Sequence, residues 1–189
     1  MTKWVASVAL AVIFSVTSVV AEPTTWEIDS EHSGVYFVVR HLGIINVHAS
    51  FNKMAGTVRL DEQEIGRSDV KATVDVSSVY TGVDARDKHL LTSDFFDYAK
   101  YPSMNFQSTK ITKTGNATAK MTGDLTIHGV TKQVTFDVTG LSAPITALKA
   151  TRRGISATTT INRNDFGISS DMTVGDQVSI DLEIDMVKK

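Results

Sequence analysis

The sequence predicts an all-β fold, an antiparallel up-and-down barrel with one short helix. Apolar residues alternate with polar ones in most segments, one segment reads as a β-hairpin of defined register, and no internal repeat or linker interrupts the 189 residues. About eight or more such strands form either a barrel or a sandwich. Closure removes the edges that long strands would otherwise expose, so we favour the barrel.

The predicted hairpin spans residues 120–138, with a two-residue turn at His128-Gly129. A turn of this length places Ile127 opposite Val130, so odd positions of the first arm share a face with even positions of the second. The apolar residues follow this parity: Met121, Leu125 and Ile127, then Val130, Val134, Phe136 and Val138. Threonines and charged residues take the other face, so further strands must close over the apolar side.

Shorter alternating segments precede the hairpin. Strands are predicted at 26–28, 35–40 and 70–76, and the last of these has the clearest alternation in the first half of the chain. Val47, Ala49 and Phe51 lie at odd positions, whereas Met54, Val58 and Leu60 lie at even ones. This change of parity requires a tight turn or a bulge between the two.

One short helix is expected within residues 83–92, where the alternation stops. Asp84 and Asp87 have the spacing of a helix N-terminus, and Leu90 and Leu91 supply apolar contacts. After the helix the sequence predicts strands at 104–108, 155–161 and 178–187, and an irregular link at 141–151.

The first 21 residues read as a secretory signal peptide. Lys3 gives a basic start and residues 4–20 are largely apolar. Val19-Val20-Ala21 fits the small-residue cleavage site of a signal peptide. An uncleaved membrane anchor is the alternative, but hydroxyl residues dilute the apolar run and no basic cluster follows it. We therefore expect an exported protein with a single domain at residues 22–189.

Charge and composition exclude several classes of function. The net charge is −2, or −3 once Lys3 is removed with the leader, and no basic block occurs, so nucleic acid is not an expected partner. The absence of cysteine excludes disulfides, thiolate metal sites and a cysteine nucleophile. The exported domain must be held together by its own core.

The interior of the predicted barrel is expected to be hollow. A barrel of eight strands is either just filled by side chains or holds one small ligand. Small residues at many inward positions favour the second case: Val35, Val39, Ala72, Val74, Val76, Ala157 and Thr159. Larger residues would then form its wall and entrance, whereas in a solid barrel they would be ordinary core: Phe37, Phe51, Phe95, Phe96, Met104 and Phe106. Burial of a lipid tail releases about 0.8 kcal/mol per methylene, which can offset an association cost of about 4–15 kcal/mol.

Catalytic alternatives have less support. Arg86, Asp87 and His89, with Asp94, could form an acid–base cluster, although such residues more often cap or pair a helix. No nucleophile elbow, P-loop or dinucleotide fingerprint occurs, so we predict no enzymatic activity. A metal-dependent hydrolase is the alternative, although the spacing of its candidate ligands matches no metal-binding motif. These ligands are His32, His41 and His48.

Several short motifs are specific when taken together. They are HSGVYF from His32, RDKHL from Arg86, DFF from Asp94, YP from Tyr101 with Phe106, LTIHGVTK from Leu125 and NRNDFG from Asn162. On these motifs the chain resembles the YceI-like lipid- and polyisoprenoid-binding family over residues 25–187. The resemblance implies a lipocalin-like, extended antiparallel β-barrel in the bacterial periplasm. It also implies an apolar tunnel for an isoprenoid or other long-chain amphiphile, and no catalysis.

The resemblance and the strand parity together give the expected ligand-binding residues. Those of the helical lid and pore wall are Arg86, Leu90, Leu91, Phe95 and Phe96. Those of the tunnel are Phe37, Val39, Val74, Val76, Met104, Phe106, Leu125, Phe136, Ile161, Phe166, Ile180 and Leu182. The expected ligand is a polyprenyl or quinone-like lipid, with no cofactor and no metal. A transient membrane contact and a homodimer stay open as further partners, and a ligand-free, stress-associated structural domain with a solid core stays open as an alternative.

Overall fold

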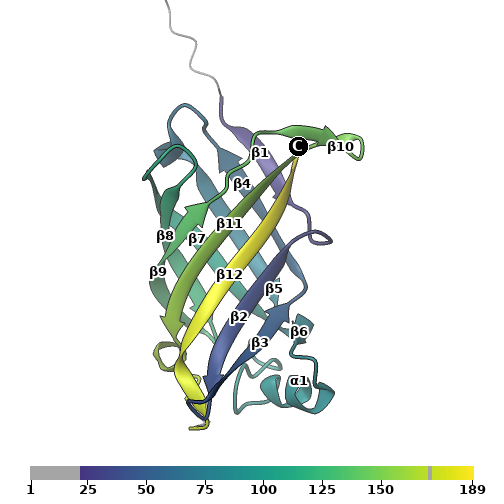
Figure 1. Cartoon of the computed structure of the whole chain (residues 1–189), viewed down its shortest axis with the longest axis vertical. Helices are drawn as coiled ribbons and strands as arrows, with labels where there is room; N and C mark the ends of the chain where they lie inside the picture. The colour runs from purple at the N-terminus through teal and green to yellow at the C-terminus, as the bar shows by residue number, and fades with distance from the viewer. Residues whose placement is uncertain (1–21, 170–171) are drawn as a thin grey trace, which may run out of the picture.

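Antiparallel strands wrap into a closed eight-stranded barrel with one short helix at its lower end (Figure 1). This computed structural model describes residues 22–169 and 172–189. The predicted signal peptide lies outside the described residues. The predicted all-β barrel and its single short helix are confirmed.

The elements follow one another in an up-and-down order. They are β1 (Thr24–Ile28), β2 (Gly34–His41), β3 (Ile45–Phe51), β4 (Met54–Leu60), η1 (Ile65–Arg67), β5 (Asp69–Asp75), η2 (Val76–Ser78), β6 (Val79–Tyr80), α1 (Asp84–Leu90), β7 (Ser103–Lys113), β8 (Ala119–Ile127), β9 (Val130–Thr139), β10 (Ile145–Ala147), β11 (Ala150–Asn162), η3 (Arg163–Phe166) and β12 (Val174–Lys188).

Three neighbouring strands of the barrel are each interrupted once. β1 and β2 pair with successive parts of β12 and are separated by residues 29–33. In the same way β4 and β3 pair with β1 and β2, and β5 and β6 pair with β4 and β3. Each pair of segments therefore acts as one long strand, and β11 closes the ring by pairing with both β9 and β12.

The turn predicted at His128-Gly129 is confirmed. The parity change after Phe51 falls at a two-residue interruption, where the chain continues in the same direction from β3 into β4, as a bulge would allow and a tight turn would not. Ile127 lies opposite Val130 in the β8–β9 hairpin, and β3 ends at Phe51 just before β4 begins at Met54. At the hairpin turn, Gly129 has φ +73°, and a Cβ there would lie 2.4 Å from the Tyr101 ring. Glycine therefore meets both the backbone and the packing requirement at this position.

The prediction of an irregular link at 141–151 is wrong in part. Residues 145–147 form β10, which pairs antiparallel with the start of β11. The turn between them uses Leu148 and Lys149, which both have positive φ. Such turns usually contain glycine or asparagine, so the sequence carries no signal for this hairpin.

The upper end of the barrel is closed by packed side chains. Trp26, Leu60 and Met186 form a buried cluster there, and Met186 is 0% exposed. The guanidinium of Arg153 lies over the Trp26 ring, 5.5 Å from its centroid. Packed side chains therefore fill this end of the barrel.

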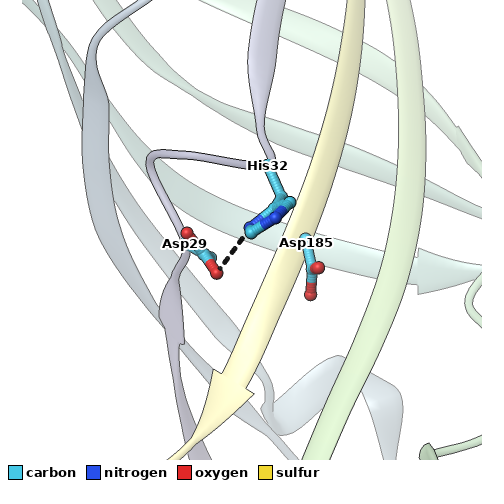
Figure 2. Close-up of side chains that lie close together, drawn as sticks. All are labelled: Asp29, His32 and Asp185. Carbon is cyan, nitrogen blue, oxygen red and sulfur yellow. Dashed lines mark hydrogen bonds and ion pairs between the residues drawn. The ribbon is translucent and has the colours of Figure 1, made fainter. Parts of the chain in front are cut away.

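A polar clasp bridges the interruption between β1 and β2. Asp29 and His32, from the connecting loop, lie beside Asp185 of β12 (Figure 2). Arg152 of β11 donates to Asp185 Oδ2 over 2.9 Å and also contacts the Asp29 carboxylate, while His32 Nδ1 lies 3.0 Å from Asp29 Oδ2. The Arg152 guanidinium, and then His32, lower the pKa of Asp29 to about 2.

We predict that Asp29→Asn destabilises the protein in a pH-dependent way. Because the folded-state pKa of Asp29 is depressed, its ionised form stabilises the fold above about pH 4, and this contribution is lost as pH falls toward 2. The variant should lose up to about 2 kcal/mol of unfolding free energy at pH 7, and its difference from wild type should shrink between about pH 4 and 2. Urea unfolding at pH 7, 4 and 2.5 measures this.

Asp137→Asn is the matched control for this prediction. Asp137 also pairs with a cation, Lys120, but its side chain is 64% exposed, and exposed pairs contribute little. An Asp29→Asn difference that stays constant from pH 7 to 2.5 would contradict the role of the clasp.

Candidate functional site

The barrel encloses an apolar cavity of about 380 Å³. Side chains from almost every barrel strand line it, and most of them are aliphatic or aromatic. Cavities of about 300–1,000 Å³ are typical of small-molecule sites. The alternative of a solid core is therefore wrong for this barrel.

All but two of the predicted ligand-binding residues line the cavity. Those on its wall are Phe37, Val39, Val74, Arg86, Leu90, Phe95, Phe96, Met104, Phe106, Leu125, Phe136, Ile161, Phe166, Ile180 and Leu182. Val76 is 1% exposed and belongs to the core, because β5 ends at Asp75 and the chain turns there. Leu91 is the C-terminal cap of α1 and packs against the same core.

Sequence reasoning missed part of the wall. Several missed residues share the parity of predicted ones on the same strand, so alternation alone could have found them: Val47, Ala49, Val70, Ile155, Val178 and Ile184. Ile168 also lines the cavity, but it lies in a loop after η3, where no periodicity exists.

Aromatic rings join the wall to the segment that carries the helix. Phe37 and Phe51, on β2 and β3, are stacked with centroids 5.3 Å apart, and Phe96 meets Phe51 edge-on at 5.4 Å. On the other side of the barrel, Phe106 and Phe136 meet edge-on at 5.4 Å. Such contacts add to the stabilisation from buried area, so they hold the helical segment against the barrel.

Polar wall residues gather at the end of the barrel beside α1. Thr81, Arg86 and His89 all line the cavity there, and Arg86 and His89 are exposed to solvent. In Figure 1 this is the lower end, opposite the C-terminus. The exposed, polar rim identifies it as the mouth of the cavity.

Arg86 is held in a fixed position at this mouth. Its Nε donates to Thr81 Oγ1 over 2.9 Å, and its Nη2 donates to the Thr81 carbonyl over 2.8 Å. The Thr81 hydroxyl and backbone N–H in turn donate to Asp87 Oδ1. The rim therefore carries a positioned cation, which can attract an anionic group.

The acid–base cluster considered from the sequence has structural roles. Arg86 and Asp87 both bind Thr81, which fixes the start of α1 against β6. His89 Nε2 lies 3.2 Å from Asp94 Oδ2, and its ring meets Phe95 edge-on. These contacts match the helix-pairing interpretation of the cluster.

The histidines considered as metal ligands do not come together. Among the residues that the structure describes, one group could hold a metal ion, namely Asp29, His32 and Asp185, and it includes neither His41 nor His48. The Arg152 guanidinium contacts Oδ2 of both carboxylates, so a positive charge already lies between them. Asp29, His32 and Asp185 do not line the cavity, so the clasp fits a structural role better than a metal site.

No helix in the described part of the chain is both long and apolar enough to span a bilayer.

Curated relatives match almost the whole chain. A UPF0312 protein of Pseudomonas putida is 36% identical over 166 residues, which cover 87% of this chain and 86% of the relative. A UPF0312 protein of Pseudomonas fluorescens is 34% identical over 188 residues, covering 99% and 98%.

Solved structures share the fold. The YCEI protein of Campylobacter jejuni is 31% identical, with a TM-score of 0.70 over 79% of this chain and 89% of that protein. Burkholderia cenocepacia BcnA has a TM-score of 0.76 at 24% identity, covering 84% and 98%. A polyisoprenoid binding domain from Saccharophagus degradans has a TM-score of 0.68 at 16% identity, covering 88% and 99%.

The family comparison agrees with the resemblance found in the motifs. The model of the YceI-like domain matches residues 26–186, which is most of the described chain. The chain therefore belongs to the YceI-like domain family.

Proposed function

We propose that the protein is a periplasmic carrier that holds a long-chain isoprenoid or similar amphiphilic lipid in its barrel cavity. The observation that carries this proposal is the apolar cavity itself, which is closed at one end by the Trp26 cluster and has a polar rim at the other. A wall with so few polar groups can bind a tail only by removing it from water. The polar end of the ligand would remain at the rim.

The cavity favours binding over catalysis. Its depth is lined by aliphatic and aromatic side chains, and the polar groups at its mouth are engaged in fixing α1. The similar fold of a domain named for polyisoprenoid binding supports the same ligand class. The apolar leader with its basic start supports export.

Filling the cavity should remove lipid binding. Ala49 lies on the wall, and a phenylalanine there would take up space that the tail requires, so Ala49→Phe should carry at least several-fold less lipid. Native mass spectrometry of protein purified without detergent, before and after addition of polyprenyl phosphate, measures the bound fraction.

His48→Phe is the matched control, because His48 directly precedes Ala49 on β3 and is exposed outside the barrel. It should carry as much lipid as wild type. Circular dichroism checks that both variants fold, since overpacking costs about 1–3 kcal/mol. Equal loading of the two folded variants would contradict the cavity as the site, and a wild type that never carries or takes up lipid would contradict the function.

The charge at the rim should select the head group. Arg86→Gln should weaken binding of a polyprenyl phosphate by roughly tenfold and leave binding of the uncharged polyprenol unchanged, because a charge-assisted contact is worth about 1.5–3 kcal/mol. Lys88→Gln removes the same charge from the same helix at an exposed position off the cavity wall, and should affect neither ligand. Displacement of a fluorescent fatty acid measures both affinities. Equal effects of the two substitutions would reject Arg86 as a head-group contact.

A further inference from the structure

Large apolar side chains project from two loops at the mouth end of the barrel. We call this cluster the apolar tip; its members are Leu42, Ile44 and Ile45 of the β2–β3 hairpin and Met172, just before β12. Their exposed fractions range from 58% to 98%. Clusters of exposed apolar side chains on soluble domains often mark binding surfaces.

The two loops of the apolar tip are fastened to each other. The Leu42 N–H donates to the Thr173 carbonyl over 2.7 Å, and His41 pairs with Val174 in the sheet. Arg163, which is 7% exposed, donates to the carbonyl of Val174 over 2.8 Å and so fixes the start of β12. The apolar side chains are thus held in a defined arrangement at the surface.

The apolar tip continues the wall of the cavity. His41 and Val174, the residues that flank its two loops, both line the cavity. In Figure 1 the β2–β3 turn and the start of β12 lie at the same end of the barrel as α1. A surface that covers the apolar tip would therefore also cover the mouth.

A lipid bilayer is the partner that suits this surface. A stable protein interface uses about 20–30 residues on each side, and the tip offers four on convex turns. Exposed Arg40 lies within the same hairpin, where its Nε donates to the Gly43 carbonyl and its Nη1 to Asn46 Oδ1. An aliphatic tip with a guanidinium at its base matches the acyl region and the phosphates of a membrane interface.

We propose that the apolar tip inserts into the interface of a lipid bilayer and places the cavity mouth against the membrane. A lipid could then move between bilayer and cavity without its tail crossing water. The transfer of lipid in this inference rests on the proposed carrier function. The membrane contact itself uses only the apolar tip and does not depend on what the cavity holds.

The opposite end of the barrel supplies a matched control. Ile145 and Leu148 of the β10–β11 hairpin are 60% and 76% exposed, but they lie at the closed end (Figure 1). Leu42 and Leu148 both occupy turns with positive φ, at 49° and 51°. The variants Leu42→Asp/Ile44→Asp and Ile145→Asp/Leu148→Asp therefore change the same residue types and the same charge at the two ends.

Sedimentation with vesicles of phosphatidylethanolamine and phosphatidylglycerol tests the proposal. Wild type and Ile145→Asp/Leu148→Asp should bind alike, and Leu42→Asp/Ile44→Asp should bind at least about tenfold more weakly, because two apolar side chains no longer enter the bilayer. Thermal unfolding verifies that both double variants are folded. Equal binding by the two variants, or no vesicle binding by wild type, would overturn the proposal.

Two further measurements separate this inference from the carrier function and from self-association. Loading of Leu42→Asp/Ile44→Asp with polyprenyl phosphate added from solvent should equal that of wild type, because the cavity is untouched. Vesicle binding by a wild type that never loads lipid would support the membrane contact and reject the carrier function. A wild-type dimer in sedimentation velocity that Leu42→Asp/Ile44→Asp dissociates would assign the tip to a second copy and overturn the proposal.

Discussion

The closed ring of hydrogen-bonded strands is the constraint on which the rest of the structure depends. The number of strands sets the diameter of a barrel, and a closed ring cannot contract around small side chains without breaking its ladders. Ala49, Ala72 and Ala157 all point into this fixed space. The volume that they leave cannot be removed by repacking the walls, as it could be between two separate sheets. The cavity is therefore a consequence of strand number combined with small inward residues.

The two ends of the barrel differ in polarity and packing, and this difference sets the orientation of a bound amphiphile. At the upper end Trp26 and Met186 are fully packed, and the Arg153 guanidinium covers the indole ring. At the lower end the wall includes Arg86 and His89, which are both exposed to solvent. An amphiphile gains most when its tail lies toward the packed end and its polar group stays at the rim, because burying an unpaired polar group is costly. The fold thus favours one orientation of a bound lipid.

Sequence reasoning succeeded where local patterns decide the structure and failed where distant segments meet. The β8–β9 register followed from parity around His128-Gly129, because alternation and turn length are local properties. The alternation from Val70 to Val76 predicts Val76 on the cavity wall. In the structure the Asp75 side chain accepts a hydrogen bond from the Ser77 N–H, so the strand ends at Asp75 and the chain turns before Val76 can face the cavity. Arg152 reaches Asp29 from 123 residues away. That contact depends on the pairing of β11 with β12 and of β12 with β1, which no single segment encodes.

Selectivity among lipids must lie mainly at the rim. Each methylene buried against an aliphatic wall contributes about the same free energy, so a pocket of this kind separates tails that differ by one methylene by only about 1–3 kcal/mol. Polar groups discriminate more strongly, because a mismatched ligand leaves a desolvated donor unpaired. Thr81 holds the Arg86 guanidinium through two hydrogen bonds, so the cation is already ordered before a ligand arrives. A positioned cation at the edge of an apolar space separates anionic from neutral amphiphiles, whereas the depth of the barrel accepts any tail that it can hold.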